Sequence, residues 1–558
     1  MFSANSFSNG KWCRITVGCA ILALLLLLIS KCECYQAEDN DVADNVGAHV
    51  KDYELTRRKV LRDINEFWWY IQSNLESFSK INKHTLKALL GKVLVEGQHR
   101  YRAIVSAVDD ISENDGHKKW REQESKDLSS IVQKRLLSLQ NPKNCSSARK
   151  LLCKLDRPCG FGCQFHNVVV CLIFAYGTER TLVLDGRHWS YNDDTEKGFE
   201  EVFMPLSTTC TFEDLDFSNN VIEKWPGTKD ANTIEFPKSV KSNRLIVNYT
   251  AIPDDLADRI IRLHGSPLLW WVSQFVKFVW QPTARTRIML DEIEKLIKNK
   301  KAPLVGVHIR RNDKIIEKEV EFYDLEEYMK PVKEFFQQIE ANHNHKLSVN
   351  KYSRQYSKQV YLASDDPNVF VECRKRFPEY EFIGDETRAA SATLSSRYSL
   401  NSLNDVIVDI HMLSLSDYIV CSLSSNVCTL AHELQQNRFV DASMKIKSLD
   451  TIWTMNPDTA WVRLQRIILN HSSTEREELN MNVGDYIRMK VNLQNGFNTG
   501  TLLKSKKSGF YPLYKTVETF RTAVLPTYPN ARNFKMANMS RASSKRERIS
   551  NVQGKAGD

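Results

Sequence analysis

The chain has 558 residues, of which 42% are hydrophobic and 26% charged, a composition typical of globular proteins with room for more than one domain. The formal net charge of +9 fits an anionic ligand or a membrane surface. Nucleic acid is not indicated as a partner, because no dense stripe of Lys and Arg with interleaved aromatic residues occurs.

The N-terminus carries a targeting signal. Lys11 and Arg14 precede the apolar segment ITVGCAILALLLLLI (15–29), and acidic residues follow it. This segment is shorter than the roughly 20 residues of a full membrane span, so a cleaved signal peptide is an alternative. The charge asymmetry predicts a cytosolic tail at 1–14 and a signal-anchor transmembrane helix at 15–30, with the rest of the chain in a lumen.

Residues 31–140 are predicted to form a helical stalk. Apolar residues recur at three- and four-residue steps in two stretches, which is the period of amphipathic helices. They include Leu55, Val60, Ile64, Phe67, Trp68, Ile71, Leu75 and Phe78, and later Leu128, Ile131, Val132, Leu136 and Leu139. The long apolar face indicates either dimerisation through the stalk or packing against the same chain, and the sequence does not separate the two.

The region 145–455 changes to alternating strands and helices. Strands are expected at 181–184, 303–309, 359–364, 380–385 and 417–425, with helices between 167 and 180, at 403–415 and at 427–435. This alternation predicts an α/β fold with a doubly wound parallel sheet. Ligands of such sheets bind beyond the carboxyl ends of the strands, where His308–Lys314, Asp365–Asp366 and Ser424–Asn426 lie.

Residues 460–525 contain short β segments at a spacing of about ten residues. The segments are LQRIILN, GDYIRMKVNL, GTLLKS and GFYPLYKTVE. Their order predicts a small SH3-like β-barrel, although 493–495 (LQN) stands where a peptide-gripping tryptophan is expected. The tail 526–558 is predicted to be flexible.

The stretch VGVHIRRNDK (305–314) ends a predicted strand in charge. The guanidinium groups of Arg310 and Arg311 can hold a phosphate in a bidentate fork, whereas the alternative is a structural pairing with Asp313 or Asp365. Ser424–Asn426 directly precede a helix, where hydroxyls and free N–H groups suit a phosphate.

Asp409 lies among apolar neighbours in VIVDIHML, where an ionised carboxylate is costly unless it is paired. It reads a guanine edge or forms a salt bridge with His411 or an arginine. If the bound phosphate belongs to an activated sugar, a carboxylate after the arginine pair is needed to take the proton from the attacking hydroxyl. Spacing does not separate the candidates Glu317, Glu319 and Glu321. No sequence motif demands a metal.

Several long blocks in the same order resemble the core α1,6-fucosyltransferases of N-glycans, from about residue 50 to 530. They include VGVHIRRNDK, EFYDLEEYM, YLASDDP, RYSLNSLNDVIVDIHMLS, CSLSSNVC, CGFGCQFHNVV, YGTERTLVL and DRIIRLHGSPLLWWVSQFVKF. The resemblance implies a GT-B-like, single-pass type II enzyme of Golgi membranes with its catalytic domain in the lumen. It implies inverting transfer of fucose from GDP-fucose to the 6-hydroxyl of the innermost GlcNAc of N-glycans, without a metal. A homodimer joined through the stalk is the expected assembly.

The resemblance also implies a role for individual residues. Arg310 binds the β-phosphate, Arg311 stabilises the same segment, and His308 and Asp409 recognise guanine. The remaining donor contacts are Asp365 near the nucleoside, Ser425 and Asn426 at the diphosphate, and Tyr191. Glu319 is the expected catalytic base with Lys314 assisting, and Glu317 remains an alternative because this segment has one extra residue.

The chain has 13 cysteines, six of them between Cys145 and Cys210 and two at Cys421 and Cys428. A cytosolic location would make Cys153, Cys159, Cys163 and Cys171 a candidate zinc site, whereas an oxidising lumen favours disulfides. The resemblance implies four disulfide bonds, Cys145–Cys210, Cys153–Cys171, Cys159–Cys163 and Cys421–Cys428. Sequons at Asn144, Asn248, Asn470 and Asn538 are compatible with a lumenal location.

The chain departs from the family pattern at four positions, of which Leu493 stands where the family has a His that helps to hold the acceptor glycan, so acceptor preference is open while donor use is expected to be kept. Asn426 stands where the family usually has Gln, Phe161 where it has Tyr, Arg157 where it has Lys and Leu493 where it has a His. Two other functions are compatible with parts of the sequence: a fucosyltransferase acting on protein hydroxyls or chitin-like sugars, and a membrane-anchored scaffold with an inactive core. The stalk with a terminal barrel disfavours the first, and the intact site residues disfavour the second.

Overall fold

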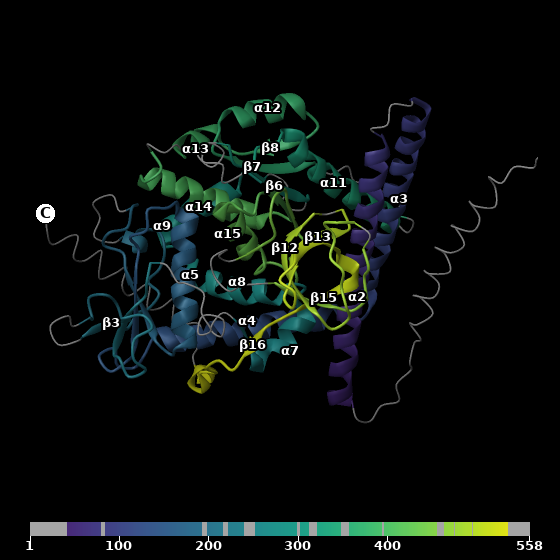
Figure 1. Cartoon of the computed structure of the whole chain (residues 1–558). Helices are drawn as coiled ribbons and strands as arrows, with labels where there is room; N and C mark the ends of the chain where they lie inside the picture. Colours follow the sequence, from purple (N-terminus) through teal and green to yellow (C-terminus); the bar gives the residue numbers. More distant parts are fainter. Residues whose placement is uncertain are drawn as a thin grey trace, which may run out of the picture. The chain divides into compact units, whose positions relative to one another are not determined.

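The computed structural model describes most of the chain from residue 42 onward (Figure 1). The described ranges are 42–79, 84–191, 198–215, 221–238, 251–297, 302–311, 321–347, 357–392, 396–454, 463–473, 475–493 and 495–533. The predicted anchor at 15–30 and the segment 312–320 with Lys314, Glu317 and Glu319 lie outside them. Within these ranges, no helix combines the length and apolar character needed to cross a membrane. The chain divides into two units, 1–53 and 54–558, and all helices and strands named below belong to the second except the first turns of the helix that begins at Val42.

Three long helices confirm the predicted helical period. They are α2 (Val42–Ser79), α3 (His84–Asn114) and α4 (Lys118–Gln140). Leu128, Val132 and Leu136 of α4 are fully buried in the main hydrophobic core. For α4 the structure therefore favours packing against its own chain over a protruding stalk, while dimerisation stays a prediction.

The first sheet is parallel and has the strand order β2-β1-β4-β3. Its strands are β1 (Lys150–Lys154), β2 (Thr181–Asp185), β3 (Ile222–Lys224) and β4 (Thr233–Glu235). Helix α5 (Phe161–Gly177) connects β1 to β2 and is apolar on nearly all sides. It is buried because it packs against α8 (Pro267–Val279) and α15 (Asn426–Gln435) as well as the sheet.

The second sheet is also parallel, with the order β10-β9-β6-β7-β8. Its strands are β6 (Leu304–Ile309), β7 (Gln359–Ser364), β8 (Glu381–Ile383), β9 (Tyr418–Cys421) and β10 (Ile446–Ser448). Every residue of β6 and β7 is buried, as expected for parallel strands covered on both faces. The predicted α/β class with parallel sheets is confirmed.

The helices near the second sheet pack either against its strands or against α14 (Leu400–Leu415), which itself lies on β6 and β7. They are α9 (Ala284–Glu294), α11 (Leu325–Leu347), α12 (Asn368–Arg376), α13 (Glu386–Ser391), α14 (Leu400–Leu415) and α15. Gly306 of β6 permits close packing, since an added Cβ would lie 2.7 Å from Ser416 Oγ and 3.0 Å from Leu413 Cδ2. Helix α14, which carries Asp409, is therefore held tightly against the strand that leads to the arginine pair.

The C-terminal region forms a five-stranded antiparallel sheet with the order β14-β13-β12-β11-β15. The strands are β11 (Leu464–Ile467), β12 (Tyr486–Asn492), β13 (Phe497–Leu502), β14 (Ser508–Pro512) and β15 (Thr516–Thr519). Ile467, Leu479, Ile487 and Tyr511 contribute to a core of its own. The predicted β segments are confirmed, while their assignment as SH3-like stays a prediction.

The remaining short elements connect the three sheets and the helices around them. They are β5 (Ile252–Pro253), α7 (Asp254–Leu263), β16 (Thr522–Ala523) and the short 3-10 helices at Gly198–Glu201, Leu513–Lys515 and Pro529–Asn533. Strand β16 pairs in parallel with β5. The chain beyond the C-terminal sheet is therefore tied back to the helical layer around α7.

Four disulfide bonds join the pairs that the family resemblance implied. They are Cys145–Cys210, Cys153–Cys171, Cys159–Cys163 and Cys421–Cys428. Cys373 is a buried free thiol, and burial raises its pKa to about 12. Among the residues that the structure describes, no group of three or more His, Cys, Asp or Glu is arranged to hold a metal ion.

Candidate functional site

The candidate site lies where three parallel strands end. Ile309, the last residue of β6, pairs with Ser364, the last residue of β7, and Val307 pairs with Val420 of β9. The segments that follow these strands therefore meet at one edge of the sheet. They are 310–311, 365–366 and 422–425, which are the segments that sequence reasoning placed at a ligand.

Arg310 is anchored by Asp365. Its Nη1 lies 3.0 Å from Asp365 Oδ2, and the other oxygen of that carboxylate accepts the backbone N–H of Arg311 at 2.8 Å. Asp365 is only 2% exposed. The pairing weighed as the alternative to a phosphate role is thus present, but it does not exclude that role, because a guanidinium has five N–H donors. The carboxylate fixes the direction in which the guanidinium points.

Arg311 has a different set of neighbours. Its Nη1 lies 3.8 Å from Glu372 Oε2 and 4.0 Å from Asp366 Oδ2, and its guanidinium carbon lies 5.1 Å from the centre of the Phe322 ring. These contacts join the end of β6 to α12 and to the segment that precedes α11. They agree with a supporting role for Arg311.

His308 is a buried histidine near the end of β6. Its side chain is enclosed at 5% exposure, and its Nδ1 has no hydrogen-bond partner among the described residues. Burial, helped by the positive charge of Arg310, lowers the pKa of His308 to about 3, so the ring is neutral near pH 7. A buried, unpaired polar atom is costly unless a ligand bonds to it. This geometry suits recognition of a base or a ribose.

Asp409 contacts two residues that the sequence did not indicate. The hydroxyl of Tyr361 donates to its Oδ1 at 2.7 Å, and Arg388 Nε lies 3.8 Å from the same oxygen. Burial raises the pKa of Asp409 to about 7, although Tyr361 and Arg388 oppose the shift. A salt bridge with His411 was expected as one alternative and is wrong, because His411 Nε2 lies 2.8 Å from Glu294 Oε1. The other alternative, a salt bridge with an arginine, is present at the long distance of 3.8 Å to Arg388.

The N-terminus of α15 faces the same region. Ser425 occupies the N-cap position without a side-chain capping bond, while the hydroxyl of the neighbouring Ser424 donates to Asp450. Asn426 begins the helix and is exposed. The free N–H groups and the positive end of the helix dipole make this a place where an anion binds well.

Tyr191 connects the arginine to the start of α5. It is buried, and its ring lies edge-on to Phe161, the first residue of α5, at 6.3 Å. Burial raises the pKa of Tyr191 to about 12, while the charge of Arg310 acts in the opposite direction, so the two side chains interact. Gly162 follows and abuts α15, since a Cβ there would lie 2.8 Å from Asn426 Cβ. The structure thus brings Tyr191 and Asn426 to the start of α5, and the charge of Arg310 reaches Tyr191.

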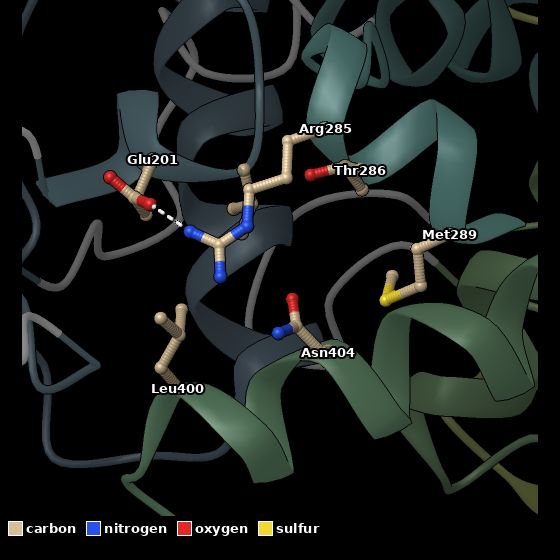
Figure 2. A pocket seen from close by; sticks show the side chains of 7 residues that line it. Glu201, Arg285, Thr286, Met289, Leu400 and Asn404 are labelled. Atoms are coloured by element: carbon tan, nitrogen blue, oxygen red, sulfur yellow. Dashed lines mark hydrogen bonds and ion pairs between the residues drawn. The ribbon is translucent and has the colours of Figure 1, made fainter.

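A cavity of about 240 Å³ lies between α9 and α14. It is lined by Glu201, Val202, Arg285, Thr286, Met289, Leu400 and Asn404. Figure 2 shows Arg285 reaching to Glu201, with Nη1 2.9 Å from Oε1. None of the predicted donor residues lines this cavity, although α14 also carries Asp409. It is therefore not the predicted donor site.

The chain matches the family described as "Alpha-(1,6)-fucosyltransferase N- and catalytic domains" over residues 30–454. The chain belongs to the alpha-(1,6)-fucosyltransferase family. It is 37% identical over 501 residues to the alpha-(1,6)-fucosyltransferase of Drosophila melanogaster, covering 88% of this chain and 77% of the relative. For the alpha-(1,6)-fucosyltransferase of Caenorhabditis elegans the identity is 32% over 436 residues, covering 77% and 74%. The resemblance inferred from the motifs is confirmed.

A solved structure, NodZ alpha-1,6-fucosyltransferase soaked with GDP-fucose, also shows similarity to this fucosyltransferase. The identity is 15%, the shares covered are 51% of this chain and 93% of that chain, and the TM-score is 0.31. With a TM-score this low, the positions of site residues are not transferred from that structure to this chain.

Proposed function

We propose that this fucosyltransferase transfers fucose from GDP-fucose, with inversion, to the 6-hydroxyl of the innermost GlcNAc of N-glycans, without a metal ion. Membership of the alpha-(1,6)-fucosyltransferase family supports the reaction class. The observation that carries the proposal is the placement of Arg310 and the N-terminus of α15 at one edge of a parallel sheet. Both supply positive charge where a diphosphate would sit.

The nucleoside is held by groups with complementary hydrogen-bonding capacity. The carboxylate of Asp409 accepts from the N1–H and 2-amino groups of guanine when it is ionised. His308 is neutral and has a free ring nitrogen, so it bonds to the base or the ribose without adding charge. Asp365 holds Arg310 in place and lies beside the nucleoside.

The positive groups act on the departing nucleotide. As the bond between fucose and the β-phosphate oxygen lengthens, the sugar gains oxocarbenium character and negative charge collects on GDP. Arg310 and the α15 N-terminus interact more strongly with this charge than with the ground state, and that difference lowers the barrier. Because Asp365 fixes the guanidinium beforehand, little reorganisation is needed when the charge develops.

The acceptor hydroxyl loses its proton as the new bond forms. Glu319 is proposed as the base, with Lys314 assisting and Glu317 as the alternative. Inversion requires that this carboxylate and the leaving diphosphate lie on opposite faces of the fucose ring. Arg311, which precedes the segment that carries these residues, lies over the ring of Phe322, which follows it, and its contact with Glu372 ties it to α12.

We further propose a Golgi location with a type II anchor at 15–30, a helical dimer interface, and an SH3-like C-terminal domain. The charge asymmetry around the apolar segment and the four disulfides support a lumenal catalytic region. Acceptor preference is the property most open to change in this chain, because Arg157, Phe161, Asn426 and Leu493 all differ from the usual family residues.

One experiment tests the proposal. Full-length protein is incubated with GDP-fucose and a set of acceptors: defined N-glycans, a chitin oligosaccharide and a protein substrate with free hydroxyls. Mass spectrometry with linkage analysis should find α1,6-linked fucose on the innermost GlcNAc of the N-glycans. Fucose found only on the other acceptors would contradict the proposed acceptor. No transfer to any acceptor would contradict the proposal that the chain is an active fucosyltransferase.

A further inference from the structure

A buried histidine–glutamate pair lies directly behind the N-terminus of α15. His166 of α5 places Nε2 2.8 Å from Glu433 Oε2 and Nδ1 3.1 Å from Asn426 Oδ1. His166 is 5% exposed and Glu433 is fully buried. Trp453 Nε1 donates to the second oxygen of Glu433 at 3.0 Å, so both carboxylate oxygens are occupied. The pair thus connects the interior to the first residue of the helix that faces the diphosphate.

The partners of the ring define its protonation. Both ring nitrogens face oxygen atoms that accept hydrogen bonds, so both nitrogens act as donors and the ring is an imidazolium. Burial lowers the pKa of His166, but the charge of Glu433 and the hydrogen bonds from its neighbours outweigh burial and raise it. A buried ion pair in which every polar atom is bonded is a rigid support, whereas removal of one partner is costly.

The same contact sets the orientation of Asn426. Its amide oxygen is bonded inward to His166, while the residue itself is exposed at the helix start. The Nδ2 group, with two N–H donors, is consequently turned outward. Without the imidazole, the amide could rotate about its broad terminal torsion and present its oxygen, which repels an anion.

The backbone at the start of α5 holds Asn426 in place. Gly162 of α5 approaches Asn426 so closely that a Cβ would lie 2.8 Å from Asn426 Cβ and 3.0 Å from its carbonyl carbon. The preceding residue, Phe161, packs against Tyr191, which interacts with Arg310. The start of α5 is held by the Cys159–Cys163 disulfide, and the turn into α15 by Cys421–Cys428.

We propose that His166 and Glu433 are positioning residues that hold the Asn426 amide with its N–H groups toward the diphosphate of the sugar-nucleotide. The proposal rests on the proposed function, because it takes the ligand at this helix end to be GDP-fucose. Neither His166 nor Glu433 touches the ligand. Their effect on the reaction passes through Asn426.

Two neutral amides separate positioning from a structural role. His166→Gln places a donor near the position of Nε2, so it can still satisfy Glu433 but not Asn426. His166→Asn places its donor near Nδ1, so it can satisfy Asn426 but leaves Glu433 with an unfilled bond. Positioning predicts that the Gln variant loses more GDP affinity than the Asn variant. A purely structural role predicts that affinity follows thermal stability, with the Asn variant the worse of the two.

The experiment measures the Kd for GDP by calorimetry on the full-length chain, with thermal unfolding of each variant in parallel. His166→Gln should bind GDP about 10- to 100-fold more weakly, the factor expected for one hydrogen bond to a charged group. The same change introduced into Asn426→Ala should cause no further loss, because its effect passes through that amide. Additive losses in the double variant would overturn the proposal.

A matched control comes from the C-terminal sheet. His471 and Glu478 form a pair with the same 2.8 Å contact, so His471→Gln tests the loss of a histidine–glutamate pair elsewhere and should leave the Kd unchanged. If neither His166 variant folds, Glu433→Gln serves, because it keeps an acceptor for Trp453 and a neutral ring that donates to Asn426. Any loss of GDP affinity in this variant should disappear in the Asn426→Ala background, because it passes through that amide, and a loss that adds to that of Asn426→Ala would overturn the proposal. Failure of the unmodified chain to bind GDP would instead refute the proposed function.

Discussion

The pKa of Asp409 leads to a pH dependence of nucleotide binding. Burial raises this pKa to about 7, whereas an ordinary aspartate titrates near 4. Only the ionised carboxylate accepts both guanine N–H groups, so the protonated form loses the contact. The Kd for GDP should therefore rise as pH falls, by a factor of about 2 at pH 7, about 10 at pH 6 and about 100 at pH 5 relative to alkaline pH.

The assay is a calorimetric titration of GDP between pH 5.5 and 8.5. The β-phosphate of GDP titrates near pH 6 as well, so Asp409→Asn is the necessary control. This variant should bind more weakly at pH 8, lack the additional pH dependence, and discriminate less between GDP and inosine diphosphate, which lacks the 2-amino group. Protonation of Asp409 does not destabilise the chain, because its folded-state pKa lies above the ordinary value, so weaker binding at pH 6 is not caused by unfolding at this residue. A pH dependence that is identical in the two proteins would refute the role of Asp409.

Three further outcomes are expected. Arg310→Ala should lower turnover about 10²–10³-fold. It should also lower the unfolding temperature, because loss of its ion pair with the buried Asp365 carboxylate costs about 3–5 kcal/mol. The double variant Arg310→Ala, Asp365→Asn should regain stability but not turnover, and regained turnover would contradict the phosphate role. Glu319→Gln should keep GDP affinity and lose turnover, whereas a silent outcome, with loss in Glu317→Gln, would move the base to Glu317. EDTA should leave turnover unchanged, since the positive charge comes from protein groups; inhibition reversed by Mn²⁺ would contradict this.

Much of the sheet edge could be predicted from sequence for a physical reason. A fully buried parallel strand is a continuous apolar run, so the charge that follows Ile309 marks the strand end without ambiguity. The same logic placed Asp365 after β7, whereas the predicted strand 417–425 ran past Cys421, where β9 ends, because no charged residue marks that strand end. Because parallel strands end at the same edge, three local patterns were enough to assemble one site.

Other parts of the site depend on contacts that no local pattern reveals. Tyr361 lies inside an apolar strand, and its hydroxyl is paired only because α14 crosses that strand at Asp409. Arg388 comes from a short helix and reads as an exposed residue in sequence. His166 and Glu433 lie in helices whose other residues are mostly buried. An ionisable residue within an otherwise apolar helix was the only feature of the sequence that could have indicated them.

The account depends on the diphosphate binding between Arg310 and the start of α15. The most direct test is an experimental structure of the chain with GDP bound. We expect phosphate oxygens within hydrogen-bond distance of Arg310, of the Ser425 hydroxyl and of the N–H groups of Asn426. Nucleotide found elsewhere, for example in the cavity between α9 and α14, with these groups unoccupied, would contradict the assignment of the site.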